Sequence, residues 1–340
     1  MNVVFRVDSS SQIGSGHLMR CITLAQRFRK EKGADVLFVV RNLDGNLINI
    51  VEEKGFNVAV LPKVEKDANL QGYEEWLTVS QERDAIESVN ILSKINVDLL
   101  VVDSYAIDII WERIVRPYVK KIMVIDDLAN RKHNCDILLD QNFYQNKETR
   151  YNGLVSEGCQ LFLGPQYAIL REEFYEARKH LKKRNGDVKN ILVFFGGVDL
   201  TNETQKTLEA ILKLNRKDIK VNVIVGQNNP HKNVIIDICD RFEFMHYYCQ
   251  VNNIAEFMNE ADLAIGAGGT TTWERCFLGL PSIVIAVAEN QIVGCEDCSN
   301  KKLIFYLGTS EYVSVDDIYN AMVYFQNAEK LLPFINSCMI

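Results

Sequence analysis

Short apolar runs alternate with longer amphipathic segments along the whole sequence, in two successive blocks. Several runs, such as Leu192-Val-Phe-Phe195, are continuously apolar, which is typical of strands buried on both faces of a parallel sheet. This pattern predicts an α/β protein with two doubly wound, Rossmann-like domains. The predicted strands are residues 2–7, 35–40, 57–61, 97–102 and 121–125 in the first block and 189–195, 219–225, 241–245, 262–266 and 282–287 in the second.

The joint between the two blocks is predicted at Gly164-Pro165, because glycine and proline punctuate this region and a new amphipathic segment follows it. Residues 1–164 would form an N-terminal domain and residues 165–340 a C-terminal domain. The last segment, residues 315–335, is predicted to form one or two helices that pack back across the first domain. Because open α/β sheets bind ligands beyond the carboxyl ends of their strands, we expect the domains to face a cleft lined by those loops.

Charge and composition exclude several classes of protein. The net charge of −7 argues against a nucleic-acid or anionic-membrane partner. No segment has the length of uncharged apolar chain that spans a bilayer, and Arg6 and Asp8 interrupt the first apolar run, so we expect no signal peptide. Nine scattered cysteines are typical of reduced thiols in a cytoplasmic protein. Cys295 and Cys298 have the spacing of half a metal or redox site, but no second pair stands at zinc-site spacing.

A glycine-paired loop joins the first predicted strand to the helix that follows it. The loop contains Gly14 and Gly16, and His17 stands where the helix begins. Glycines let a ligand approach the backbone, and the free N–H groups of a helix start attract anions. The positive end of the helix dipole favours neutral imidazole, which can accept a proton. Local chemistry alone leaves His17 either as a base or as a structural residue, and Asp8 as a group that orients it or binds a ligand hydroxyl.

Residues 266–274 form a second glycine-rich loop, which follows the predicted strand 262–266. Its three glycines and three threonines indicate a phosphate cradle, and Glu274 stands where a carboxylate can accept both hydroxyls of a ribose. The alternative is that Glu274 only caps the helix. Gly196 and Gly197 follow another strand and either wrap a ligand or form a tight turn before a capped helix. The spacing matches neither a Walker loop nor a strict dinucleotide fingerprint.

Acidic residues end two further predicted strands in the first block. Asp103 follows one strand and Asp126-Asp127 the next, where a carboxylate either faces the ligand or caps a helix. Asp126-Asp127 could also bind a divalent metal, but no Asp-x-Asp pattern follows a strand, so we expect no required metal. No other cofactor is expected. The other four histidines stand without obvious partners and are interpreted as solvated or structurally satisfied: His133, His180, His231 and His246.

The order of these motifs resembles the PseG family, the UDP-2,4-diacetamido-2,4,6-trideoxy-β-L-altropyranose hydrolases of pseudaminic acid biosynthesis. The resemblance covers most of the chain up to about residue 307. It is carried by Asp8, Ile13-Gly-Ser-Gly-His17, Arg20-Cys21, Val102-Asp-Ser-Tyr105, Ile125-Asp-Asp127, Asp140-Gln-Asn142, residues 163–171, Phe195-Gly-Gly197, residues 266–274 and Glu289-Asn-Gln291.

The resemblance implies a GT-B fold and hydrolysis of a UDP-sugar by water, with inversion at the anomeric carbon. His17 would be the general base, the 266–272 loop would hold the diphosphate and Glu274 the ribose. The segment from Tyr248 to Val251 would contact uracil through its backbone. The full set of residues expected to bind substrate is Asp8, Gly14, Gly16, Arg20, Asp103, Gly196, Gly197, Val251, Gly268, Gly269, Thr270, Thr271, Glu274, Asn290 and Gln291.

Two other functions remain as alternatives. An inverting glycosyltransferase on the same scaffold would use His17 to deprotonate a sugar hydroxyl, and its release of UDP would require an acceptor. A non-catalytic nucleotide-sugar binding module would bind a UDP-sugar without turnover.

Overall fold

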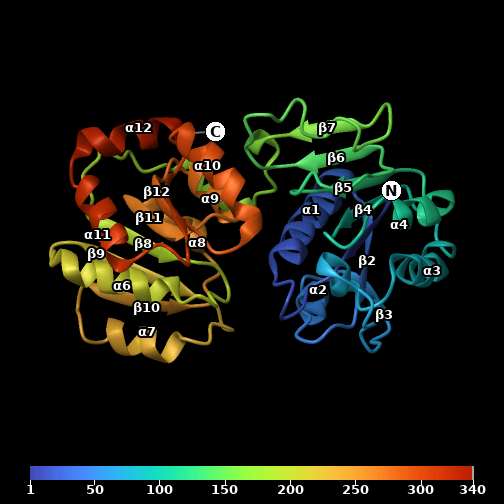
Figure 1. The fold of residues 1–340 in the computed structure, drawn as a ribbon, viewed down its shortest axis with the longest axis horizontal. Coiled ribbons are helices and arrows are strands. Elements are labelled where there is room, and N and C mark those ends of the chain that lie inside the picture. The colour runs from blue at the N-terminus through green and yellow to red at the C-terminus, as the bar shows by residue number, and fades with distance from the viewer. Residues whose placement is uncertain (339–340) are drawn as a thin grey trace. The chain divides into compact units, whose positions relative to one another are not determined.

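The computed structural model describes residues 1–338, and the chain divides into two compact units (Figure 1). The first unit comprises Met1–Asn142 and Asn146–Ile169, and the second comprises Phe143–Gln145 and Leu170–Ile340. The division after Ile169 lies five residues beyond the boundary inferred from Gly164-Pro165. Among the described residues, none of the helices combines the length and apolar character needed to cross a membrane.

The first unit is built on a seven-stranded parallel sheet of order β3-β2-β1-β4-β5-β6-β7. The order reverses direction between β1 and β4, which makes the loops after these two strands neighbours. Its elements are β1 (Asn2–Val7), α1 (Gly16–Lys32), β2 (Asp35–Arg41), α2 (Ile48–Glu53), β3 (Asn57–Leu61), η1 (Gly72–Leu77), α3 (Gln81–Leu92), β4 (Leu99–Asp103), α4 (Ile109–Val115), η2 (Arg116–Tyr118), β5 (Ile122–Ile125), β6 (Ile137–Asp140), β7 (Gln160–Leu163) and η3 (Pro165–Tyr167).

The two faces of this sheet bury different side chains because successive residues of a strand point in opposite directions. Phe5 and Val101 pack with the apolar side of α1, whereas Val4 and Val102 pack with α3 and α4. Arg6 also points to the α3 side. There Arg6 and Arg41 both donate hydrogen bonds to the buried carboxylate of Asp84.

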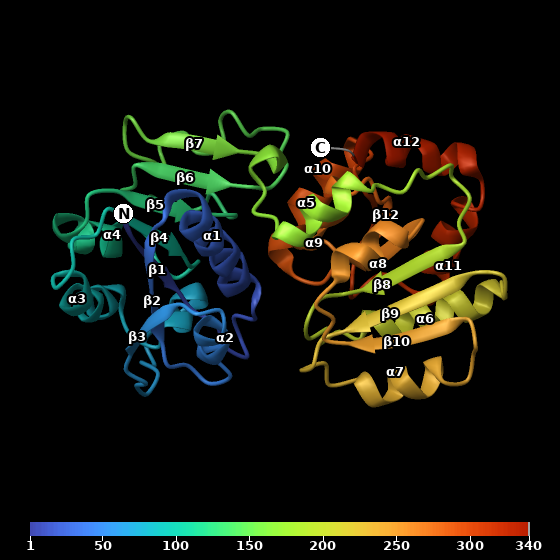
Figure 2. The ribbon, with the colours of Figure 1, turned by 180° about the vertical axis from the view of Figure 1, so that it is seen from behind.

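The second unit is built on a six-stranded parallel sheet of order β10-β9-β8-β11-β12-β13. Helices α6, α7, α11 and α12 enclose one core with this sheet, while α5, α8 and α9 pack together on the other side (Figure 2). Its elements are α5 (Glu172–Lys179), β8 (Asn190–Phe194), α6 (Glu203–Leu214), β9 (Lys220–Val225), α7 (Lys232–Cys239), β10 (Met245–Cys249), α8 (Ile254–Glu260), β11 (Leu263–Ala267), α9 (Thr271–Phe277), β12 (Ser282–Ala286), η4 (Glu289–Gln291), α10 (Ile292–Asn300), β13 (Phe305–Thr309), α11 (Val315–Tyr324) and α12 (Ala328–Cys338).

Three features of the second unit differ from the expectations. The strand expected at 241–245 is β10, Met245–Cys249, because the apolar side chains of Phe242 and Phe244 pack against the core from the turn before it. Strand β13 was not predicted, because Gly308 and a threonine interrupt its short apolar run. Its pairing with β12 contains a β-bulge. The final segment, which was expected to pack back across the first domain, forms α11 and α12, and their side chains Ile318, Leu331 and Phe334 lie in the core of the second unit.

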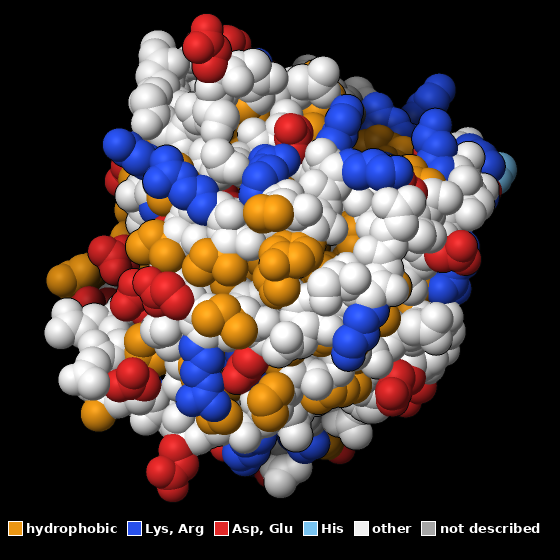
Figure 3. Space-filling model, turned by 90° about the vertical axis from the view of Figure 1, so that its right-hand side faces the viewer, with side chains coloured by type: hydrophobic (Ala, Val, Ile, Leu, Met, Phe, Trp, Pro, Cys, Tyr) orange, Lys and Arg blue, Asp and Glu red, His pale blue; other side chains and the backbone are white. Residues whose placement is uncertain are grey.

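One face of the molecule, on the side where α3 and α4 lie, carries hydrophobic side chains between charged ones of both signs (Figure 3). Ile86 on α3 is 58% exposed and Ile110 on α4 is 45% exposed. Folded proteins commonly expose apolar side chains singly, so these residues carry no functional assignment.

Candidate active site

The loop before α1 folds into a tight turn that places His17 at the start of the helix. The backbone N–H of Gly14 donates to the carbonyl of Ser10 at 2.9 Å, and the Ser10 hydroxyl accepts from the N–H of Ile13 at 3.0 Å. Gly14 has a φ of 77°, a conformation that favours glycine. His17 is the second residue of α1 and is 8% exposed. The position expected for the histidine is therefore confirmed.

The partner of His17 is Asp103, at the carboxyl end of β4. His17 Nδ1 lies 2.6 Å from Asp103 Oδ1. Because a carboxylate accepts, the neutral ring carries its proton on Nδ1 and its lone pair on Nε2. Val7 of β1 pairs with Asp103 of β4, so both side chains point to the face of the sheet that α1 covers. The sheet register thus brings together His17 and Asp103, which are 86 positions apart in the sequence.

Arg20, one helical turn after His17, holds Asp103 from the other side. Its guanidinium donates through Nε and Nη2 to the two Asp103 oxygens, at 2.6 and 2.7 Å, and through Nη1 to Asp127 at 2.8 Å. Burial alone would raise the pKa of Asp103, but the adjacent charges of Arg20 and His17 hold it well below its usual range. An ionised Asp103 fixes the ring of His17 and stabilises the imidazolium that forms when His17 takes a proton.

Asp8, the other candidate to orient His17, faces away from it. Asp8 Oδ1 lies 2.7 Å from Arg6 Nη1 and accepts the backbone N–H of Arg41 at 2.7 Å. It shares a sheet face with Arg6, opposite the face that α1 covers, because the two residues are two positions apart. Asp8 is therefore not the orienting carboxylate. Its oxygen Oδ2 is buried without a hydrogen-bond partner among residues 1–338.

Two aromatic side chains meet the His17 ring, and a third packs against those two. Tyr105, two residues after Asp103, lies edge-on to His17 with ring centroids 4.6 Å apart, and its hydroxyl donates to Asp127 at 2.7 Å. Trp76 of η1 stacks on Tyr105 at 5.4 Å and meets His17 edge-on at 5.8 Å. Tyr73 packs against both. The role of Trp76 was not predicted, since it lies in a polar stretch far from any strand end in the sequence.

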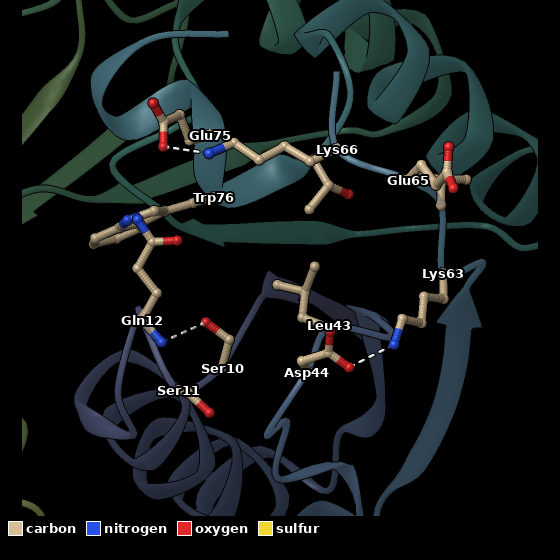
Figure 4. A pocket seen from close by; sticks show the side chains of 12 residues that line it. Ser10, Ser11, Gln12, Leu43, Asp44, Lys63, Glu65, Lys66, Glu75 and Trp76 are labelled. Atoms are coloured by element: carbon tan, nitrogen blue, oxygen red, sulfur yellow. Dashed lines mark hydrogen bonds and ion pairs between the residues drawn. The ribbon is translucent and has the colours of Figure 1, made fainter. Parts of the chain in front are cut away.

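A pocket of about 630 Å³ opens within the first unit, beyond the carboxyl ends of β1, β2 and β3 (Figure 4). Gln12 and Trp76 border one end of it, and the ion pair between Lys63 and Asp44 borders the other. The residues that line it are Ser10, Ser11, Gln12, Leu43, Asp44, Lys63, Val64, Glu65, Lys66, Glu75, Trp76 and Thr78.

A second group of carboxylates lies behind Arg20, at the ends of β5 and β6. Asp127 accepts hydrogen bonds from Arg20, from the Tyr105 hydroxyl and from the side-chain amide of Asn142. Burial, followed by the neighbouring charge of Asp127, raises the pKa of Asp140 to about 7. The folded protein therefore keeps a proton on Asp140 at a pH where an ordinary carboxyl of an unfolded chain, with a pKa near 4, has lost it.

This raised pKa predicts a pH-dependent contribution to stability. The contribution is fully present below about pH 4 and is lost as the pH rises to about 7, because the unfolded chain releases the proton more easily. Its size is at most about 4 kcal/mol, at about 1.4 kcal/mol per pKa unit. Asp140→Asn, neutral at every pH, should remove this part of the slope of urea-unfolding free energy against pH. The control is Asp44→Asn, whose carboxylate is 86% exposed. A slope that survives in Asp140→Asn would contradict the assignment.

In the second unit, the glycine-rich segment 266–274 comprises the end of β11, a short loop at residues 268–270 and the start of α9, and it is closely packed. A Cβ on Gly266 would collide with the carbonyl of Phe194, and one on Gly268 with the sulfur of Cys295. Arg275 holds the two ends of the loop together, since its Nη2 donates to the carbonyl of Ala267 at 2.8 Å and to the Thr272 hydroxyl at 3.0 Å. Cys295 is a buried free thiol that packs beneath the loop.

Glu274 presents one bound and one unbound oxygen. Oε1 accepts from Arg171 at 3.0 Å, while Oε2 is buried and has no hydrogen-bond partner among the described residues. Burial raises the pKa of Glu274 although Arg171 lowers it in part. A carboxylate that caps a helix accepts hydrogen bonds from backbone N–H groups at the helix start. Glu274 Oε1 instead accepts from the side chain of Arg171. A buried oxygen with a free lone pair fits a ligand hydroxyl.

The remaining predicted positions lie at the other strand ends of this unit. Asp199 accepts the backbone N–H groups of Glu203 and Thr204 at the start of α6, so the Gly196-Gly197 turn leads into a capped helix. Gly196 has a φ of 92°. Tyr248 lies within β10 rather than in the loop after it, which begins at Gln250.

Gln291 of η4 lies beside the glycine loop. A Cβ on Gly268 or Gly269 would touch its side-chain amide, and its Oε1 accepts the N–H of Val287 at 3.0 Å. Asn290 precedes it in η4. In the first unit, His133 is buried and its Nδ1 lies 2.7 Å from Glu112 Oε1, while its Nε2 has no hydrogen-bond partner among the described residues.

Comparisons with known proteins agree with this architecture. The description "Glycosyltransferase family 28 C-terminal domain" matches residues 190–301, within the second unit. The chain is similar to the UDP-2,4-diacetamido-2,4,6-trideoxy-beta-L-altropyranose hydrolase of Campylobacter jejuni, 27% identical over 86% of this chain and 93% of that protein. It is also similar to an uncharacterized protein of Methanocaldococcus jannaschii, 28% identical over 86% of this chain, and spans 57% of that longer relative.

Solved structures show the same fold. The crystal structure of MurG from Acinetobacter baumannii superposes with a TM-score of 0.67 over 99% of this chain and 94% of that one, at 10% identity. Two parallel sheets with flanking helices in this arrangement are the GT-B fold, as predicted.

Proposed function

We propose that this chain hydrolyses a UDP-sugar and releases UDP and 2,4-diacetamido-2,4,6-trideoxy-L-altrose, because two proteins similar to it carry the name UDP-2,4-diacetamido-2,4,6-trideoxy-beta-L-altropyranose hydrolase. The observation that carries the proposal is the His17–Asp103 pair, which leaves a lone pair on His17 Nε2. An oriented, buried imidazole of this kind is a general base.

In the proposed reaction, His17 Nε2 takes a proton from water while the water oxygen bonds to the anomeric carbon. The bond from that carbon to the phosphate oxygen breaks on the opposite face, and its electron pair leaves with UDP, so the configuration inverts. UDP is a good leaving group once its charge is stabilised, whereas an alcohol leaving group also needs a proton from an acid. One base therefore suffices.

The second unit would hold the nucleotide. The backbone N–H groups and hydroxyls of Gly268, Gly269, Thr270 and Thr271 would bind the diphosphate, and Glu274 Oε2 would accept a ribose hydroxyl. The backbone around Val251 would contact uracil. Gln291 borders the same loop, Asn290 precedes it in η4, and both are proposed to contact the bound substrate there.

The proposal is tested by incubating the protein with UDP-2,4-diacetamido-2,4,6-trideoxy-β-L-altropyranose without an acceptor. Stoichiometric UDP and free sugar are expected, with the sugar first appearing as the inverted anomer by NMR. Release that requires an added sugar or alcohol would assign the chain as a glycosyltransferase instead. Tight binding without release would assign a binding module.

Glu274→Gln should weaken UDP binding about tenfold, because a hydrogen bond to a charged acceptor contributes about 1.5 kcal/mol or more. The loss should be confined to the ribose: calorimetry should show 2′,3′-dideoxy-UDP binding nearly unchanged. The matched control is Glu173→Gln, since Glu173 pairs with the same Arg171 at 2.6 Å. Equal losses for both variants, or for both nucleotides, would show that Glu274 only positions Arg171.

A further inference from the structure

The pocket in the first unit lies directly beside the proposed base, and the proposed function leaves it unused. Trp76 both lines the pocket and meets the His17 ring edge-on, and Gln12 lines it from the loop that leads into His17. If the anomeric carbon of the substrate is held near His17, this pocket therefore lies next to that carbon. The group that enters it must be attached to the sugar close to the reacting carbon.

The wall formed by Trp76 is apolar and fixed in place. Its indole stacks on Tyr105 with an interplanar angle of 29°, and Tyr73 packs edge-on against it at 5.0 Å. Tyr105 is itself anchored by its hydroxyl on Asp127. A ring supported from two sides sets a firm limit on the size of a group that packs against it.

One wall offers neutral hydrogen-bonding side chains. Ser10 and Ser11 contribute hydroxyls and Gln12 a side-chain amide, while the N–H groups of Ser11 and Gln12 already donate to the carbonyl of Asp44 and the hydroxyl of Ser10. The two lysines at the pocket already face acidic partners, Lys63 with Asp44 and Lys66 with Glu75, both at 2.5 Å (Figure 4). Glu65, the remaining charged residue of the lining, adds a negative charge, so the pocket suits a neutral group with an amide and a small apolar end better than a phosphate or a carboxylate.

We infer that this pocket receives the acylamino group on the sugar carbon next to the anomeric carbon, and that Trp76 limits the length of its acyl chain. The inference rests on the proposed function and adds to it the residue that selects among N-acylated UDP-sugars. Amide atoms of the substituent face the Ser10–Gln12 side, and its methyl group packs on the indole.

The test compares kcat/KM for the diacetamido substrate with kcat/KM for analogues that carry propionyl or butyryl at the same nitrogen. The wild-type protein should prefer acetyl over butyryl by about tenfold or more, because the longer chain meets the fixed indole. Trp76→Ala should reduce that preference at least tenfold and Trp76→Phe by less. The matched control Tyr73→Phe alters a neighbouring ring outside the lining and should keep the wild-type preference.

Three outcomes separate the possibilities. Loss of rate without a change in acyl preference in Trp76→Ala would overturn the inference, and would make Trp76 a support for His17 alone. The pH profile of kcat should stay unchanged in Trp76→Phe, since the pair of His17 with Asp103 is untouched. If wild-type protein hydrolyses none of the UDP-sugars, the proposed function fails, which is distinct from hydrolysis without acyl selectivity.

Discussion

His17→Asn is expected to lower kcat by about 10²–10⁴-fold, the usual contribution of a positioned general base. Asparagine is close in size to the imidazole and can fill the same space beside Tyr105. It has no basic nitrogen with which to take a proton from water. KM and the affinity for UDP should change little, because the proposed nucleotide residues belong to the second unit. Single-turnover hydrolysis and UDP calorimetry measure the two separately.

His246→Asn serves as the matched control, since His246 lies on β10 in the second unit. A His17→Asn protein that hydrolyses substrate at the normal rate would refute the proposed mechanism. A variant that loses UDP binding together with turnover would show that His17 holds the substrate rather than the water.

Asp103→Asn is expected to lower kcat to a similar degree without removing the base. The asparagine oxygen would accept from Arg20, which turns the asparagine NH2 group toward His17 Nδ1. The ring then carries its proton on Nε2 and cannot accept one from water. Because Arg20 loses the buried negative charge of Asp103, a stability cost of about 3 kcal/mol should accompany the loss of activity.

Asp127→Asn is the control, because Asp127 shares Arg20 but lies outside the contact with His17. Its effect on kcat should be far smaller than that of Asp103→Asn at a similar stability cost. Equal kinetic losses in both variants would mean that Arg20, and not the tautomer of His17, limits the rate. The pH profile of kcat should change shape only in Asp103→Asn.

Strand alternation explains how far the site could be predicted from sequence. Asp8 and Asp103 both end strands of the first sheet, and local chemistry does not distinguish them as partners of His17. The register of β1 with β4 does, because Val7 and Asp103 share the face that α1 covers while Asp8 faces α3. That neighbour relation depends on the strand order β3-β2-β1-β4, a long-range property that no local pattern contains.

The fold itself was predicted best at the centres of the sheets. Strands such as β8 and β12 are continuous apolar runs, because they are buried on both faces. Strand β7, at a sheet edge, has exposed or half-buried residues throughout and gave no such signal. Trp76 escaped prediction for a related reason: a 3-10 turn carries it to His17, and no periodicity marks that turn.

The confinement of the His17–Asp103–Arg20 arrangement to one unit has a consequence for how such enzymes diversify. The match to a glycosyltransferase domain covers residues 190–301, all in the other unit, so one half of the chain carries a part shared with transferases. The half with the histidine can then change its chemistry, from activating an alcohol to activating water, without redesign of the shared half. Chimeras that join this first unit to a related second unit are a direct route to new hydrolases.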